Sequence, residues 1–168
     1  MAIKDKVFKG KLKQVANFNF KDTYSFIYDH LSDEGWEIHE GLFREKTLGE
    51  NLKEYNINWK MTKNISDYFQ YEINIGWILL AIKDVKVNID GKEVKMQNGT
   101  LELNFDATLI KDPDDKWKEG FMRSMREIYD NFIIRNTIED YEVDLFEKVN
   151  ELIAVIKTYL AIEGQHQY

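Results

Sequence analysis

The sequence predicts an α+β domain built on a curved antiparallel β-sheet of about six or seven strands, in the order β-α-β6-α, with one face covered by long C-terminal helices. Two observations lead to this prediction. Apolar and polar residues alternate through most of residues 36–111, which is typical of strands with one buried face. Over residues 112–163 apolar residues instead recur every three or four positions, which is the period of amphipathic helices.

The bulk properties indicate one intracellular domain. The chain has 168 residues, so we expect a single domain over residues 1–168, with the sheet and one short helix in 1–111 and the helical region in 112–163. It contains no cysteine, which excludes disulfides and thiolate sites and fits a reducing compartment. The first residues carry no apolar signal segment, and the longest apolar run, Trp77–Ile82, is far shorter than the ~20 residues of a membrane helix. We therefore expect a cytoplasmic protein without a transmembrane segment.

The charge is acidic and unevenly distributed. A net charge of −7 argues against nonspecific binding to nucleic acid, which requires Lys and Arg to neutralise phosphates. Residues 1–21 hold six lysines and one acid, whereas residues 127–168 hold nine acids and three basic residues. We interpret both segments as solvated faces. The alternative is a bipolar molecule that uses one end to bind a partner.

The first two elements are a strand and a helix. Residues 6–15 alternate between lysines and mostly apolar residues, which predicts a half-buried strand. Residues 20–34 then change to the helical period, with Asn19 placed to cap the start and Gly35 placed to end the helix.

An antiparallel meander follows from Trp36. Its strands are joined by short segments rich in turn-forming residues. Two of these segments are dipeptides that strongly favour a hairpin turn. We also expect a bend or bulge at Gly76, in the middle of a long extended stretch. The turn segments are residues 48–51, residues 64–67, Asp90-Gly91 and Asn98-Gly99.

The C-terminal region predicts two helices. Asp112-Pro113 signals the start of the first, whose expected buried stripe is Trp117, Phe121, Ile128 and Phe132. A second begins near Thr137 and carries an apolar stripe that is too broad for a coiled coil, so it covers either the sheet or another subunit. Lys116–Arg126 interleaves basic with aromatic and Met residues. An amphipathic core helix explains it, and the alternative is a helix that contacts a membrane surface or a partner.

No motif for catalysis or metal binding stands out. His30 and His39 have no neighbours at ligand spacing, and Glu163 with His166 forms one Glu-x-x-His, where carboxylate metal sites need two. The acids of residues 112–119 lack the glycine and the terminal glutamate of a calcium loop. There is no P-loop, dinucleotide fingerprint or nucleophile elbow. We therefore predict no catalytic residue, no metal site and no cofactor.

Two sets of residues are candidates for binding. Large aromatic residues of the covered face form a packed core in the simpler interpretation, or line an amphipathic cavity between the sheet and the C-terminal helix. The second set, on the broad stripe of the last helix, would form a homodimer or partner interface. The ligand-binding candidates are Tyr55, Trp59, Tyr71, Phe105 and Tyr129, and the interface candidates are Leu145, Leu152, Ile156 and Tyr159.

This order of strand, helix, antiparallel meander and long helix resembles the helix-grip fold of the START and Bet v 1-like superfamily, over roughly residues 6–135. The chain departs from that pattern in having one short helix after the first strand instead of two, and in the extra helical stretch from about Thr137. The resemblance implies that a hydrophobic small molecule binds between the sheet and the last helix.

We therefore expect a non-catalytic protein that binds a hydrophobic or amphipathic small molecule. The alternative is a structural or adaptor protein with a solid core, which acts through homodimerisation or through partner binding by its acidic C-terminal helix. An enzyme of the same fold is a third, weaker alternative, for which the sequence selects no residues.

Overall fold

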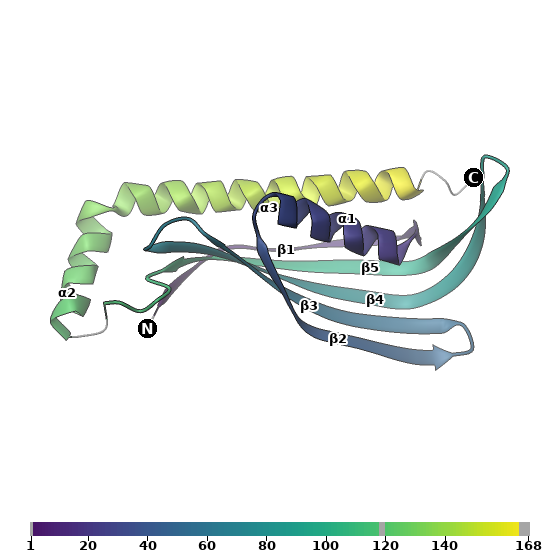
Figure 1. The fold of residues 1–168 in the computed structure, drawn as a ribbon, viewed down its shortest axis with the longest axis horizontal. Coiled ribbons are helices and arrows are strands. Elements are labelled where there is room, and N and C mark those ends of the chain that lie inside the picture. The colour runs from purple at the N-terminus through teal and green to yellow at the C-terminus, as the bar shows by residue number, and fades with distance from the viewer. Residues whose placement is uncertain (1, 118–119, 165–168) are drawn as a thin grey trace.

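The computed structural model describes residues 2–117 and 120–164, with the side chain of Phe121 left out. One antiparallel sheet has the long helix α3 lying along one face, with the shorter α1 beside it, while α2 turns away beyond one end (Figure 1). The elements are β1 (Ile3–Phe18), α1 (Phe20–Asp33), β2 (Glu37–Gly49), β3 (Leu52–Asn64), β4 (Phe69–Ile89), β5 (Lys92–Lys111), α2 (Gly120–Ile128), the π-helical turn η1 (Tyr129–Ile133) and α3 (Arg135–Gly164).

The sheet has five strands in the order β1-β5-β4-β3-β2, and all neighbours are antiparallel. Strands β2 to β5 form the expected meander, and β1 pairs with the last of them. The predicted α+β class with an antiparallel sheet beneath a C-terminal helix is therefore confirmed. The predicted number of strands was too high.

Long strands account for this difference. The 21-residue β4 runs straight through Gly76, and its irregularity comes just after Leu80, where Ala81 has φ +54°. Gly99 lies inside β5 and not in a turn. A Cβ on Gly99 would lie 2.6 Å from Ile82 Cδ1 and 2.9 Å from the Leu80 carbonyl oxygen, so glycine allows the close approach of the irregular β4.

The local signals around α1 and the first hairpins are confirmed. Asn19 caps α1, because its side-chain oxygen accepts a hydrogen bond from the Asp22 N–H at 3.1 Å. Gly35 follows the helix with φ +82°, the left-handed conformation that favours glycine. Asp90 and Gly91 join β4 to β5 with φ values of +50° and +79°, as a tight hairpin turn requires.

The hydrophobic core lies between the sheet and α3. One face of α3 is buried against the sheet, and α1 covers the neighbouring part of the same face (Figure 1). The opposite face of the sheet carries polar side chains, and no helix of the described ranges lies on it in Figure 1. The buried residues of α3 are Leu145, Val149, Leu152, Ile156 and Leu160.

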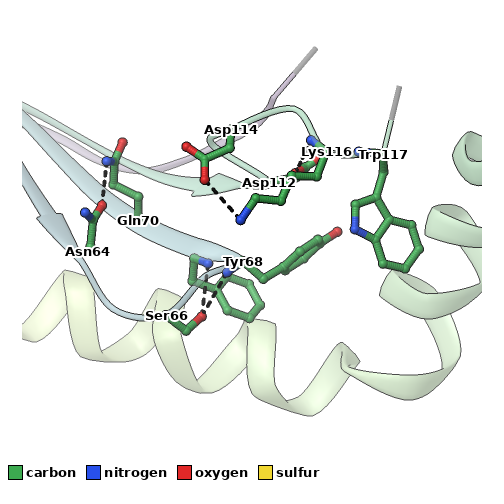
Figure 2. A network of polar contacts seen from close by, with 9 residues as sticks. Asn64, Ser66, Tyr68, Gln70, Asp112, Asp114, Lys116 and Trp117 are labelled. Carbon is green, nitrogen blue, oxygen red and sulfur yellow. Dashed lines mark hydrogen bonds and ion pairs between the residues drawn. The ribbon is translucent and has the colours of Figure 1, made fainter. Parts of the chain in front are cut away.

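The prediction for the start of the helical region was wrong. Asp112 has φ +51° and begins a turn, and residues 113–117 are not helical; α2 is described over Gly120–Ile128. The Asp112 carboxylate accepts hydrogen bonds from the backbone N–H groups of Lys116 at 2.8 Å and Trp117 at 3.1 Å. Figure 2 shows this turn at the end of the sheet, with the Tyr68 side chain directed towards Trp117. An aspartate that stabilises a turn in this way resembles a helix cap in sequence.

The predicted buried stripe of the first C-terminal helix was also wrong. Ile128 is 52% exposed and Phe132 is 82% exposed, while the side chain of Phe121 lies outside the described part. In Figure 1, α2 projects beyond the end of the sheet, away from the face that α3 covers. Across the described ranges, no helix is long and apolar enough to cross a membrane.

Candidate functional site

A pocket of about 340 Å³ opens at the end of the sheet where α1 begins. This exceeds the ~300 Å³ at which small-molecule sites start. We call it the end pocket. Its lining combines residues from the start of α1, the β2–β3 turn and the ends of three strands, namely Asn19, Phe20, Lys21, Asn51, Lys53, Tyr55, Ile82, Asp84, Lys95 and Gln97.

The shape of the sheet creates this pocket. Beyond the irregularity at Ala81, β4 and β5 continue as a hairpin that rises towards the helices (Figure 1). The first turn of α1 lies opposite, directly after β1 ends at Phe18. The pocket is the space between the helix start and the base of this hairpin.

One wall of the end pocket is apolar and aromatic. The rings of Phe20 and Tyr55 lie 5.2 Å apart between centroids, and Ile82 beside them is buried. Behind them Phe20 meets Trp77 edge to face at 6.5 Å. Burial raises the pKa of the Tyr55 hydroxyl, and the charge of Glu45 adds to the effect. Lys53 acts in the opposite direction and lowers the pKa of Tyr55, through its charge and a hydrogen bond.

Hydrogen bonds hold the polar side of the pocket in place. The Gln97 side-chain oxygen accepts from the Phe20 N–H at 2.9 Å, and its amide nitrogen donates to the Asp84 carboxylate at 3.1 Å. Asn51 donates to the Asp84 backbone carbonyl at 3.3 Å. These bonds join α1, β4, β5 and the β2–β3 turn, so the pocket is organised before any ligand enters.

The charged groups of the lining are mostly positive. Three lysines and one aspartate line the pocket of a chain whose net charge is −7. Lys53 forms an ion pair with Glu45 at 2.6 Å, and that bond is the main cause of its raised pKa. Lys21 and Lys95 form no ion pair with any residue that the structure describes.

The ligand-binding candidates chosen from sequence do not come together in one place. Tyr55 lines the end pocket, whereas Trp59, Tyr71 and Phe105 are buried in the core on the same face of the sheet. Tyr129 lies beyond the opposite end, stacked on Trp117 with the ring centroids 5.5 Å apart. That all five bind a ligand stays a prediction.

The other lining residues were missed by sequence reasoning, and the physical reason is their position. They are polar residues at strand ends and in turns, where no periodic pattern marks them. Strand register and the rise of the β4–β5 hairpin bring these residues together. The spacing of residues along the chain predicts neither of these features.

The residues predicted to form a partner interface are occupied within the chain. Leu145, Leu152 and Ile156 are buried on the face of α3 that packs on the sheet. Tyr159 stacks on Phe26 of α1 with ring centroids 4.1 Å apart. A partner of α3 would therefore contact other side chains of this helix. That α3 binds a partner at all stays a prediction.

A second polar cluster lies at the opposite end of the sheet. Arg126 and Asp112 form a buried ion pair at 2.8 Å, and the Tyr68 hydroxyl donates to Asp130 at 2.6 Å. Burial and the bond to Asp130 raise the pKa of Tyr68. Lys111 lies 3.5 Å from the other oxygen of Asp130. Because these groups pair with one another, the cluster serves to attach α2 and η1 to the sheet.

That the chain has no metal site stays a prediction. Within residues 2–117 and 120–164, no three His, Cys, Asp or Glu side chains are grouped so as to hold a metal ion. His166 lies outside the described residues.

Comparisons of the chain with protein-family models, with curated proteins and with solved structures give no match. Its function is therefore inferred from its own geometry.

Proposed function

We propose that the chain is a non-catalytic binding protein that holds a small amphipathic molecule in the end pocket. The observation that carries the proposal is a pocket of about 340 Å³ with an aromatic wall on one side and hydrogen-bonded polar groups on the other. Ligand sites typically combine an apolar lining with a few fixed polar groups. This position, at the start of α1, differs from the site beneath the C-terminal helix that the sequence resemblance implies.

The chemistry of the lining suits binding better than proton transfer. The raised pKa of Tyr55 keeps its hydroxyl away from titration near pH 7, where an efficient acid or base would need to exchange protons. Asp84 accepts a hydrogen bond from Gln97, which gives it a structural role. Phe20 and Tyr55 offer flat apolar surface at little entropic cost, because aromatic side chains have few rotatable bonds.

Binding of the fluorescent amphiphile 8-anilinonaphthalene-1-sulfonate tests this proposal. We expect saturable binding at one site per chain, weakened about tenfold by Tyr55→Ala. Phe43→Ala is the matched control, because the Phe43 ring meets the Tyr55 ring edge to face, with centroids 6.2 Å apart, but Phe43 does not line the pocket. Native mass spectrometry of protein purified from its own cells would then identify a retained ligand. The proposal is overturned if the probe binds nowhere with defined stoichiometry, or if both variants bind it like the wild type.

A second candidate function is homodimerisation, as in the adaptor alternative. Exposed apolar side chains on α2 and η1 favour it, because contiguous apolar surface of this kind often marks an interaction site. Sedimentation equilibrium of the wild type and of Phe132→Asp tests it. A dimer that the substitution dissociates supports assembly, and a wild-type monomer at all concentrations refutes it. The exposed residues are Met122, Met125, Ile128, Phe132 and Ile133.

A further inference from the structure

The end pocket has more cationic than anionic groups, and only some of the cations are neutralised within the chain. Glu45 holds the Lys53 ammonium at 2.6 Å. Asp84 is the one acid among the described residues of the lining, and its carboxylate accepts a hydrogen bond from the Gln97 amide at 3.1 Å. Lys21, from α1, and Lys95, from β5, line the same pocket without an ion pair to any described residue.

Several backbone N–H groups at the start of α1 are already engaged, so charge recognition falls mainly to the lysine side chains. The Asn19 N–H donates to Glu163 at 3.2 Å, the Phe20 N–H to Gln97 at 2.9 Å and the Asp22 N–H to the Asn19 side chain at 3.1 Å. Glu163 and Asp22 are the nearby acids on the helices, and neither lines the pocket. Among the described residues, the lining therefore keeps a net positive charge, with Lys21 and Lys95 outside any ion pair against the single carboxylate of Asp84.

We infer that the ligand of the end pocket is an amphipathic anion, whose carboxylate, phosphate or sulfate head group lies between Lys21 and Lys95 while its apolar body packs on Phe20 and Tyr55. This inference rests on the proposed function. Lys21 and Lys95 are both exposed, so each contributes a modest, salt-dependent attraction to the head group. The local positive charge also favours encounter with anions by a chain whose net charge is −7.

A series of probes that share one apolar tail tests the head group. We would measure the binding of octanoate, octyl phosphate and octan-1-ol by isothermal titration calorimetry at about physiological ionic strength. The two anions are expected to bind about tenfold or more tightly than the alcohol. Inorganic phosphate, tested alone, separates recognition of the free anion from recognition of the amphiphile.

Matched lysine variants test the assignment. Lys95→Met and Lys21→Met remove a charge with little loss of volume, and each should weaken octanoate binding about fivefold or more while leaving octan-1-ol unchanged. Lys13→Met is the control, because this lysine lies on the exposed polar face of the sheet and makes the same change in net charge. Urea unfolding of each variant checks that the fold is retained.

The outcomes separate this inference from the proposed function. If octan-1-ol binds as tightly as octanoate, or if the two pocket variants behave like Lys13→Met, the head-group inference is overturned and the binding function stands. If none of the octyl probes binds, both fail. If inorganic phosphate binds as tightly as octyl phosphate, the lysine assignment survives, but the aromatic wall has no role and the proposed function is wrong.

Discussion

Two tryptophans that touch in the core differ in the surroundings of one nitrogen. Trp59 and Trp77 are each 1% exposed, with ring centroids 4.9 Å apart. The Trp59 indole N–H donates to the Tyr24 hydroxyl and to Glu40, both at 3.3 Å. The Trp77 indole nitrogen has no hydrogen-bond partner among the residues described.

This difference predicts unequal costs for the same substitution. Both Trp→Phe changes remove similar volume, but only Trp59→Phe also removes the two hydrogen bonds that the indole N–H donates. We therefore expect Trp59→Phe to lower the free energy of unfolding by about 1 kcal/mol more than Trp77→Phe. Urea denaturation of both variants measures the difference. Equal costs would show that the hydrogen bonds of Trp59 contribute nothing net.

Two strand glycines give a second comparison at this scale. A Cβ on Gly99 would overlap the backbone oxygen of Leu80, whereas a Cβ on Gly41 meets nothing within 4 Å. Gly99→Ala is expected to cost about 1–3 kcal/mol of unfolding free energy, and Gly41→Ala none. Thermal unfolding followed by circular dichroism compares them. If Gly99→Ala left the free energy of unfolding unchanged, the irregular part of β4 would be able to shift at little cost.

At the scale of elements, α2 and η1 are attached mainly by polar and aromatic contacts. Most of their described apolar side chains are exposed, so burial of these side chains contributes little to their position. The buried pair Arg126–Asp112, with side-chain exposures of 5% and 1%, connects α2 to the turn after β5. Removing one partner of a buried ion pair leaves the other charge buried without a partner.

Arg126→Met should therefore release α2 and η1. The expected local cost is about 3 kcal/mol or more, with a corresponding rise in amide hydrogen exchange over residues 120–133 while β3 stays protected. Arg123→Met is the control, because Arg123 is exposed on the same helix. Unchanged exchange in Arg126→Met would show that other contacts suffice to hold these elements.

At the scale of the whole molecule, several partly buried tyrosines respond together to alkaline pH. Burial is the largest cause in each case, and hydrogen bonds to carboxylates add to it. The pKa rises to about 12 for Tyr24 and for Tyr159. Burial and the bond to Asp144 also raise the pKa of Tyr71.

These shifts predict a loss of stability in alkali. In the unfolded chain tyrosines ionise near pH 10, whereas Tyr24, Tyr71 and Tyr159 stay protonated to higher pH in the folded chain. Their contribution is complete below pH ~10 and declines as the pH rises towards 12. The free energy of unfolding in urea, measured at successive pH values, should fall over this window, and less steeply in Tyr71→Phe. A flat profile would contradict the prediction. Tyr28→Phe is the control, because Tyr28 is more exposed.

Local signals predicted local structure well. Asn19 capped its helix, Gly35 ended it and Asp90-Gly91 turned the chain, because each preference acts within a few residues. The period of two predicted an antiparallel sheet with one buried face for the same reason. Prediction failed at Gly99 and at Asp112. Gly99 was predicted to form a turn, but it allows β4 to approach closely. Asp112 was predicted to start a helix, but it stabilises a turn and pairs with Arg126 of α2.

The amino-acid sequence by itself determined the α+β class, the buried side of the central strands and the helix that covers the sheet, because hydrophobic periodicity encodes burial directly. The tertiary structure alone decided the number of strands, the exposure of α2 and the end pocket. These depend on register, on the irregularity after Leu80 and on side chains far apart in the chain. Lys21, Tyr55 and Lys95 share a pocket because folding places them together, and their spacing along the chain does not indicate it.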